Sequence, residues 1–342
     1  MGLDIGIHSS KVVELQYTEE KAVLKTYGEL LSATYLKETE SAGGGFLRYI
    51  DTEIAKLIKD LIQESNVATR LAVMSLPASS SFITTINLPR AIRSEIDQAI
   101  PFEARKYIPI PISEVILDWD IIEKTDDRES VEVIIVAVPR EVIDKFRRVA
   151  EMAEITPLAL EVETFSMVRS LAGHDQTPTA IINIGFQETT LTIVDKARLR
   201  NSHYINRGSE ELTRILERGL GVNRERAEAI KQEAGLSERI EEREITSVIT
   251  PLLESLFSEI ERFISMYNRR AERKVQKIIL TGGGSNLKGL VEFAASRFGI
   301  EIARGNPFAK IVSPPFMQPL LREIGPSFSV AAGLALREIA TR

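Results

Sequence analysis

The sequence predicts an α/β fold made of two related halves, and three observations support this. Apolar runs that suit strands alternate with amphipathic stretches that suit helices. Residues 2–15, GLDIGIHSSKVVEL, align position by position with residues 181–194, IINIGFQETTLTIV. The two copies begin at residues 2 and 181 of a 342-residue chain, so each opens one half, as expected for a duplicated unit.

Composition narrows the class of protein. A chain of 342 residues can form two domains, and 44% hydrophobic with 27% charged residues is ordinary for a globular protein. The net charge of −6 and pI near 5.5 argue against a nucleic-acid partner. No apolar run approaches 18 residues, and Asp4 lies too close to Met1 for a signal peptide. The absence of cysteine excludes disulfides and thiolate sites, which suits the cytoplasm.

The first element is an apolar strand that carries Asp4 and breaks into a polar turn at Gly6, before a second strand resumes at Val12. The turn contains two hydroxyls and the ammonium of Lys11. Such a group of donors suits phosphate, and a carboxylate behind it suits a hydrated magnesium ion. An ordinary polar hairpin with one satisfied aspartate is the alternative interpretation.

The second copy predicts the same strand, turn and strand in the second half. In the alignment Asn183 falls on Asp4, and Gly185 on Gly6. Likewise Thr189 falls on Ser10, and Thr190 on Lys11. Two such turns could hold one phosphate chain from both sides.

Between the two copies, the sequence predicts a helix on residues 47–61, a strand at 70–76 and an inserted unit at about 90–156. The inserted unit is expected to contain a helix near 91–107, strands at 115–123 and 131–138, and a helix from about 140 to 153. Pro101 predicts a kink or break in the first of these helices.

The second half continues with helices. Two are expected within residues 207–232, separated near Gly219 and Gly221, followed by a longer amphipathic helix with Pro251 in its first turn. The cations at 269–274 are interpreted as the solvated end of that helix. A strand at 277–282 then meets Gly282, Gly283 and Gly284 at the start of another helix, a suitable place for a phosphate or ribose, although a tight turn explains the glycines equally well.

Three phosphate-suited turns in this order, DIGIHSSK, NIGFQETT and TGGGSN, resemble the two phosphate motifs and the adenosine motif of the actin-like ATPase superfamily. The segment SVAAGLALRE at 329–338 resembles the small-residue helix that connects the two halves there. This resemblance covers the whole chain. It implies a two-lobed actin-like fold with duplicated ribonuclease H-like domains, and ATP with magnesium as ligands.

Within the superfamily, residues 98–120, QAIPFEARKYIPIPISEVILDWD, are similar to the inserted subdomain of the PilM family of type IV pilus assembly proteins. The residues that carry this resemblance are Glu103, Ala104, Tyr107, Ile108, Pro109, Pro111 and Glu114. The segments RGSEELTRILERGLG and AEAIKQ also resemble PilM and its relative FtsA. The family partner is the cytoplasmic N-terminal tail of PilN, an inner-membrane protein, so the resemblance implies an adaptor at the inner face of the membrane with possible self-association.

The resemblance also implies roles and boundaries. Phosphate contacts would come from Gly6, Ser9, Ser10, Lys11, Gly185, Thr189 and Thr190, adenosine contacts from Glu228, Lys231, Gly282, Gly283, Gly284 and Asn286, and Asp4 would hold magnesium through water. Glu228 and Lys231 could instead form a solvated helical face. The expected segments are 1–90 and 156–178 for the first lobe, 91–155 for the insertion, 179–328 for the second lobe and 329–342 for the connecting helix.

Asn183 departs from the family pattern, which has an aspartate at this position. Its neutral side chain removes one of two carboxylates that would order magnesium and the attacking water, so ATP turnover is expected to be slow or absent. Two alternatives share the ATP motifs: a filament-forming ATPase related to FtsA and MreB, and a small-molecule kinase, for which the sequence offers no obvious carboxylate base.

Overall fold

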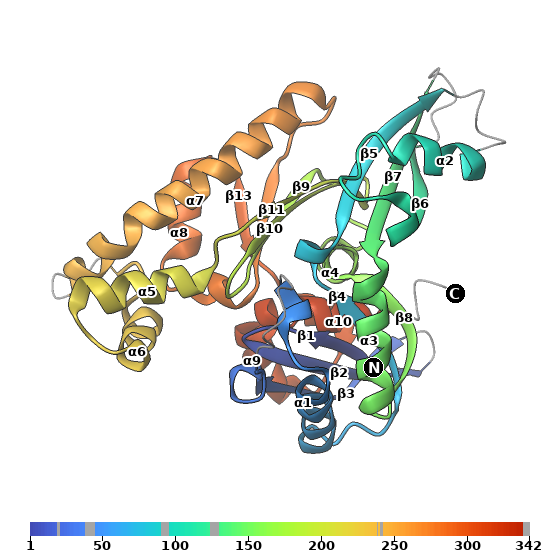
Figure 1. The fold of residues 1–342 in the computed structure, drawn as a ribbon. Helices are drawn as coiled ribbons and strands as arrows, with labels where there is room; N and C mark the ends of the chain where they lie inside the picture. Colours follow the sequence, from blue (N-terminus) through green and yellow to red (C-terminus); the bar gives the residue numbers. More distant parts are fainter. Residues whose placement is uncertain are drawn as a thin grey trace. The chain divides into compact units, whose positions relative to one another are not determined.

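The structure is a computed structural model that describes residues 1–18, 21–37, 45–89, 96–123, 130–237, 239 and 242–337 (Figure 1). The chain divides into two compact units. Unit 1 contains Met1–Arg169, Arg198–Ser202 and the C-terminal segment from Val330, and unit 2 contains Ser170–Ala197 and His203–Ser329. The finer division into five segments stays a prediction.

Unit 1 is built on a mixed sheet in which strands follow the order β3-β2-β1-β4-β8. The strands are β1 (Gly2–Ile5), β2 (Ser9–Thr18), β3 (Lys21–Leu31), β4 (Leu71–Leu76) and β8 (Thr156–Val162). The β1/β2 and β2/β3 pairs are antiparallel, whereas β4 is parallel to both β1 and β8. The sheet therefore begins with the predicted hairpin and continues with parallel strands.

Amphipathic helices bury their apolar faces against this sheet. Helix α1 (Asp51–Glu64) contributes Ile54, Ile58 and Leu61, and α3 (Arg140–Met152) contributes Phe146 and Val149, all of which belong to one core cluster. The short helix α4 (Glu163–Met167) follows β8. Strand β4 confirms the strand predicted near 70–76, because its residues from Ala72 onward are buried.

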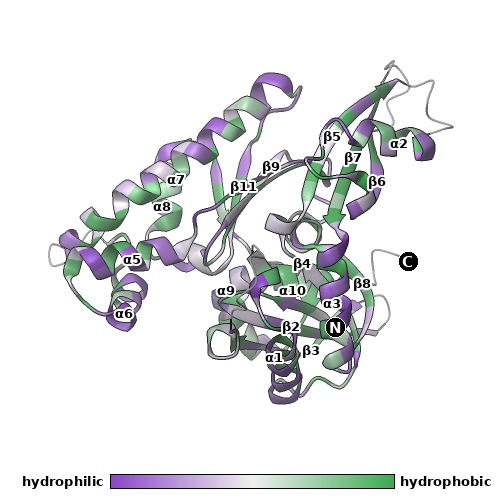
Figure 2. Cartoon of the chain, viewed as in Figure 1, coloured by the Kyte–Doolittle hydropathy of each residue, from purple (hydrophilic) through white to green (hydrophobic). Residues whose placement is uncertain are grey.

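The inserted part forms a separate three-stranded antiparallel sheet in the order β5-β7-β6, with its own core. Its elements are β5 (Phe82–Pro89), α2 (Ile96–Ala104), β6 (Val115–Glu123) and β7 (Ser130–Pro139). Strand β7 is hydrophobic along most of its length (Figure 2). Helix α2 continues through Pro101 without a break, because residues beyond the proline still complete the helix to Ala104.

Unit 2 repeats the strand pattern of unit 1. Its sheet has the order β11-β10-β9-β12-β13, with β9/β10 antiparallel and β12 parallel to both β9 and β13. The strands are β9 (Thr179–Ile184), β10 (Thr189–Asp195), β11 (Arg198–Ile205), β12 (Lys277–Thr281) and β13 (Glu301–Arg304). The short β14 (Ile311–Val312) follows in the chain and is not part of this sheet. The repeated topology supports the duplication that the sequence alignment predicted.

The helices of unit 2 are α5 (Ser209–Leu220), α6 (Arg224–Ala234), α7 (Arg243–Arg270), α8 (Leu290–Phe298) and α9 (Gln318–Ile324). Gly221 ends α5 in a left-handed conformation, which confirms the predicted separation from α6. The expectation for Pro251 was wrong, because α7 begins at Arg243 and the proline lies well inside it. Pro251 is exposed, so the carbonyl that loses its helical partner can be solvated.

The C-terminal helix α10 (Ser329–Ala335) is rich in small residues because it packs closely against other parts of unit 1. A Cβ atom on Gly333 would lie 1.9 Å from the Ser166 carbonyl oxygen, and a Cβ on Gly2 would lie 2.1 Å from that of Ala331. The Tyr17 hydroxyl also donates to the carbonyl of Ala335 at 2.5 Å. Among the helices of the described part of the chain, none is long and apolar enough to cross a membrane.

Candidate functional site

The first turn, between β1 and β2, has a backbone that only glycine fits at residue 6. A Cβ atom there would lie 2.5 Å from the Ser9 carbonyl oxygen. Ser32, just after β3, closes the turn: its amide donates to the His8 carbonyl at 2.8 Å, and its hydroxyl donates to the Gly6 carbonyl at 2.7 Å. The Ser10 hydroxyl lies 3.0 Å from the Ser32 hydroxyl. Ser10 therefore helps to hold the turn in shape.

One face of this hairpin carries its charges. Asp4 and Lys11 are paired across β1 and β2, and Ser9 lies on the same face as Lys11 because side chains alternate along a strand. The Lys11 ammonium donates to the Ser9 hydroxyl at 2.6 Å and lies 3.2 Å from a carboxylate oxygen of Glu29. Ser10 lies on the opposite face. The structure thus brings Asp4, Ser9 and Lys11 together.

The two carboxylates near Lys11 shift in opposite directions. Burial raises the pKa of Asp4, although Lys11 and a 2.8 Å hydrogen bond from Ser75 oppose the shift. Burial also opposes ionisation of Glu29, but the positive charge of Lys11 prevails and lowers the pKa of that carboxyl. The charge of Lys11 therefore influences the ionisation of both carboxylates at the first turn.

The second turn, between β9 and β10, repeats the backbone of the first. A Cβ atom on Gly185 would lie 2.9 Å from the Glu188 carbonyl oxygen, the counterpart of the Gly6 and Ser9 contact. The Thr189 hydroxyl donates to the Arg207 carbonyl at 2.8 Å, just after β11, as Ser10 contacts Ser32 just after β3. Thr189, like Ser10, holds its turn in shape. The amide of Ser209, at the start of α5, donates to the Gly185 carbonyl at 2.9 Å.

The charged pair of the first turn is replaced by a neutral pair in the second. Asn183 and Thr190 are paired across β9 and β10, and Asn183 also lies beside Thr281 of β12. The Thr190 side chain is buried, and its hydroxyl has no hydrogen-bond partner among the described residues. A buried hydroxyl without a partner is uncommon in folded proteins, and Thr192 two residues on has another. Because Thr190 lies next to the turn, it is the candidate ligand contact.

The three glycines after β12 serve close packing at two positions. Gly282 has a φ of +82°, and a Cβ atom there would lie 2.4 Å from Oδ1 of Asn183. A Cβ atom on Gly284 would lie 2.4 Å from Cγ2 of Ile184. Gly283 is exposed and has no close contact of this kind. The glycine segment is therefore packed directly against the strand that carries Asn183.

Asn286 lies in the same segment, in the short helix η8 (Gly283–Asn286), and is exposed. Its side-chain oxygen Oδ1 accepts a 2.6 Å hydrogen bond from the Arg304 guanidinium. The segment also contacts the end of α6, because the Leu236 amide donates to the Lys288 carbonyl at 2.8 Å. The structure thus brings the glycine segment and the AEAIKQ helix together, while their adenosine role stays a prediction.

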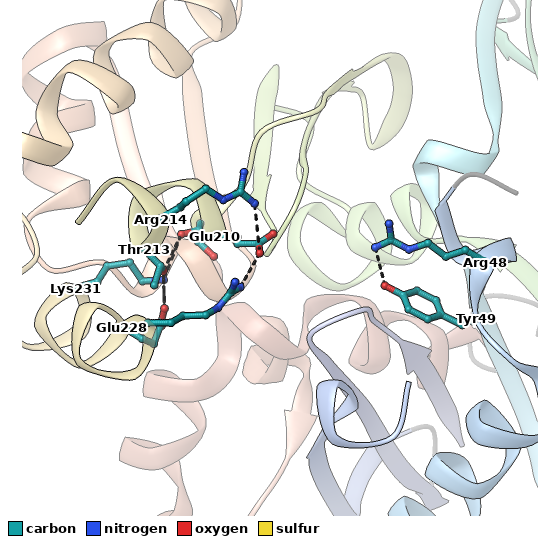
Figure 3. Close-up of polar contacts among 9 residues, drawn as sticks. Arg48, Tyr49, Glu210, Thr213, Arg214, Glu228 and Lys231 are labelled. Atoms are coloured by element: carbon teal, nitrogen blue, oxygen red, sulfur yellow. Dashed lines mark hydrogen bonds and ion pairs between the residues drawn. The ribbon is translucent and has the colours of Figure 1, made fainter. Parts of the chain in front are cut away.

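Glu228 and Lys231 form a polar link between α6 and α5 (Figure 3). The Lys231 ammonium is buried and donates to Glu228 at 2.7 Å, to the Thr213 hydroxyl at 2.9 Å and to the Ser209 carbonyl at 3.3 Å. The Thr213 hydroxyl donates to Glu228 at 2.6 Å. Burial lowers the pKa of Lys231, and Lys231 lowers the pKa of Glu228 although burial opposes this. Glu228 and Lys231 therefore contact α5 and do not form a solvated helical face.

Sequence reasoning missed a second polar cluster at the start of α5. Glu210 accepts a 2.6 Å hydrogen bond from Arg224 and lies 3.5 Å from Arg214 (Figure 3). Burial opposes its ionisation, but Arg224 and a hydrogen bond from Gln187 lower the pKa of Glu210. Gln187 belongs to the second turn, so this cluster holds that turn against α5 and α6. An acidic residue in the first turn of a helix was the available signal.

Comparison with known proteins identifies the family. The family model described as type IV pilus assembly protein PilM matches residues 2–339. The chain belongs to the PilM family. The match includes both turns, the inserted sheet and the glycine segment, so it confirms the resemblance inferred from residues 98–120.

The chain is also similar to solved structures and curated relatives. A PilM-PilN type IV pilus biogenesis complex matches with a TM-score of 0.84 and 26% identity, over 99% of this chain and 98% of that one. The cell division protein FtsA of Enterococcus hirae is 21% identical over 350 residues, 88% of this chain and 77% of that protein. A MamK double helical filament matches with a TM-score of 0.55 and 12% identity, over 100% of this chain and 98% of that one. The fold is therefore actin-like.

Proposed function

We propose that this PilM-family chain is an ATP-binding adaptor of type IV pilus assembly that holds the cytoplasmic tail of a PilN-like inner-membrane protein. It would be located at the inner face of the cytoplasmic membrane. The observation that carries the nucleotide part is the pair of matching turns, each of which has a backbone that leaves no room for a side chain at its glycine. Family membership and the similarity to a PilM-PilN complex support the partner.

In this proposal Lys11, Ser9 and the amides around Gly6 bind the phosphates, and Thr190 and the second turn contribute from β10. Ser10, Thr189 and Gly185 shape the turns and contribute mainly through the backbone. Gly282, Gly283, Gly284 and Asn286 would contact adenosine, with Glu228 and Lys231 holding α5 and α6 beside it. The Lys231 ammonium already has three partners, which favours this supporting role.

Magnesium fits the donor set on the first turn. The described residues contain no cluster of three or more metal-binding side chains, and Mg²⁺ bound to ATP needs only one or two carboxylates because waters and phosphates supply the rest. Asp4 could hold such a hydrated ion through water. When bound, magnesium would neutralise phosphate charge, while Asn183 supplies no second carboxylate, so turnover should be slow or absent.

The inserted sheet offers a place for an extended tail, because its two edges differ. On β6 the amides of Trp119 and Ile121 donate to the side chains of Asp118 and Asp120 at 2.9 and 2.8 Å. Arg198 donates to the Ile121 carbonyl at 2.8 Å. Side chains thus occupy this edge, which hinders the addition of another strand.

The β5 edge has outward backbone groups without partners in the described part of the chain, although the side-chain hydroxyl of Thr85 donates to the Arg200 carbonyl at 2.9 Å. In an antiparallel sheet, the backbone groups of successive residues point alternately to the two neighbouring strands. Because the amides of Trp119 and Ile121 point away from β7, the register of the three strands can be followed across to β5. On β5, the backbone groups of Ile83, Thr85 and Asn87 point away from β7. None of these three backbones has another hydrogen-bond partner among the described residues. An extended peptide could therefore add to β5 by main-chain pairing, with alternate side chains giving specificity.

Calorimetry with ATP and with a peptide of the partner tail tests both parts. Asn87→Pro removes one outward amide from β5 and should weaken peptide binding about 2- to 12-fold, the contribution of one hydrogen bond. Asn87→Ala is the matched control, because it removes the same side chain and keeps the amide. ATP affinity should be the same in both variants. Equal peptide affinity in the two variants would place the tail elsewhere, and a wild-type chain that binds no ATP would refute the nucleotide part.

A filament-forming ATPase is the second candidate, supported by the fold shared with the MamK filament. Sedimentation of the full chain with and without ATP separates the two. Sedimentable polymers that form with ATP would favour the filament.

A further inference from the structure

The end of α7 carries a group of cations that the proposed adaptor function does not use. Residues 262–274 contain five cations and one carboxylate, in a chain whose net charge is −6. The cations are Arg262, Arg269, Arg270, Arg273 and Lys274. We call the four of them other than Arg273 the α7 basic patch.

The α7 basic patch is exposed and unpaired. All four side chains are exposed, and none forms an ion pair or hydrogen bond with a described residue. Arg273, by contrast, donates to Asp195 at 2.5 Å and to the Gln176 carbonyl at 2.9 Å. Some other cations of unit 2 are also paired, such as Arg224 with Glu210 and Arg297 with Glu261, whereas others such as Arg218 have no partner among the described residues.

Helix-end electrostatics explains only part of this arrangement. Cations in the last turn offset the partial negative charge of the helix end, which accounts for Arg269 and Arg270. Arg262 lies two turns earlier, and Lys274 lies beyond the helix. Between them Met266 is 50% exposed on the same side as Arg262 and Arg269, away from the buried Ile264.

The segment after α7 is held in place, so the positions of these cations are defined. The Val275 amide donates to Asn268 at 2.9 Å, and the Ala271 amide donates to the Tyr267 carbonyl at 2.9 Å. Together with the contacts of Arg273, these bonds fix Lys274 next to the helix end. The patch is therefore a built surface of one helix face and one turn.

We propose that the α7 basic patch docks on an anionic phospholipid surface. Guanidinium groups match phosphate geometry with two parallel hydrogen bonds, and three of the four cations are arginines. Clusters of four or more cations on an amphipathic helix suit anionic headgroups. The thioether of Met266 gives the patch a central apolar group that can enter the interface between headgroups. This contact is independent of the nucleotide and of the partner tail.

Vesicle sedimentation with the full chain tests the proposal at low ionic strength. The wild-type chain should bind vesicles that contain phosphatidylglycerol and should not bind pure phosphatidylcholine vesicles. Each cation at an anionic surface contributes roughly fivefold in affinity, so Arg269→Gln with Arg270→Gln should weaken binding about 25-fold. Binding should also fall steeply with added salt.

The matched control is Arg218→Gln with Arg226→Gln, which changes the charge equally at two exposed positions of unit 2 whose side chains have no partner in the described part of the chain. It should bind vesicles like the wild type, and all proteins should show the same unfolding transition. A wild-type chain that does not bind anionic vesicles overturns the proposal, as does equal weakening in the two double variants. Binding of a polyglutamate peptide without vesicle binding would also overturn it, in favour of an acidic protein partner.

Discussion

The first and second turns share a scaffold and differ in the side chains placed on it. Gly6 and Gly185 make the same close approach to a carbonyl three residues later, and Ser10 and Thr189 each tie the hairpin to the end of the third strand. Across the paired strands, however, unit 1 has Asp4 opposite Lys11, whereas unit 2 has Asn183 opposite Thr190. The two duplicated turns therefore share the backbone shape but differ in the charge of the paired side chains.

The difference indicates a division of labour. In unit 1 the ammonium of Lys11 lies among Ser9, Glu29 and Asp4, so phosphate charge would be met there. In unit 2 neither residue of the pair carries a charge, and Thr190 has an unused hydroxyl. A neutral second turn can position phosphate oxygens but supplies little charge to drive their transfer. From this asymmetry we expect ATP binding without rapid turnover.

Removing the charge of the first turn should have the largest effect. Lys11→Ala deletes a charge-assisted contact of about 1.5–3 kcal/mol, so ATP affinity should fall about 10- to 100-fold in calorimetry. Lys21→Ala is the control, because Lys21 is exposed on the neighbouring strand and has no ion pair with a described residue. If both variants bind ATP like the wild type, Lys11 does not contact the phosphates.

Adding charge to the second turn should have the next largest effect. Asn183→Asp restores a carboxylate at the end of β9, so ATP hydrolysis should rise roughly tenfold from a wild-type rate well below 1 per second. Asn201→Asp, on an exposed position of β11, controls for the added charge. A wild-type turnover of about 1 to 100 per second, as in kinases, would contradict this account of Asn183.

The unused hydroxyl provides a smaller and more specific test. Thr190→Val preserves shape and removes a buried hydroxyl that has no partner among the described residues, so the free energy of unfolding should stay the same or rise slightly. ATP affinity should nevertheless fall about 2- to 12-fold if the hydroxyl binds phosphate.

Thr192→Val is the matched control for Thr190→Val. Thr192 lies on the same face of β10 two residues further on, and its hydroxyl is also buried without a partner among the described residues. Its removal should leave ATP affinity unchanged. An equal loss in both variants would point to a general effect on the strand.

Much of this comparison could be predicted from the sequence, and the reasons are physical. The duplication was visible because strands, turn glycines and hydroxyls recur in register, and the strand order of both sheets bears it out. Asn183 was recognisable as a departure from Asp4 for the same reason. The family resemblance came from residues 98–120, where Tyr107 and the nearby prolines form an unusual pattern.

Other features depend on contacts that no local pattern carries. The Lys231 ammonium is held by Thr213 and Ser209, which belong to another helix. The Glu210 carboxylate is held by Arg224 and Gln187, which are distant from it in the sequence. The predicted start of α7 was too late, because proline is favoured in the first turn of a helix and Pro251 indicated that turn. In the structure α7 begins at Arg243, and its buried apolar side includes Ile249, before the proline. Tertiary burial outweighed the local signal.

The smallest effect concerns the pH dependence of stability, and it separates the two turns without any ligand. The pKa of Glu29 is lower in the folded chain than its ordinary value, so its contribution is complete above that value, about 4.3, and is lost as the pH falls below it. The pKa of Asp4 is raised, so its contribution has the opposite sign and is lost as the pH rises through the raised value. The second turn has no titrating group at the equivalent positions 183 and 190.

Urea unfolding between about pH 3 and pH 6 should therefore show a shallower acid loss of stability in Glu29→Gln than in the wild type. Glu29 is partly exposed, so solvent screens the effect and the change should be modest. Thr190→Val should keep the wild-type slope, because it alters no proton-binding group. Glu151→Gln, at an exposed position of α3, controls for the loss of a carboxylate. If Glu29→Gln and Glu151→Gln have equal slopes, Lys11 does not hold Glu29 in its charged form, and the charged network of the first turn is weaker than its geometry suggests.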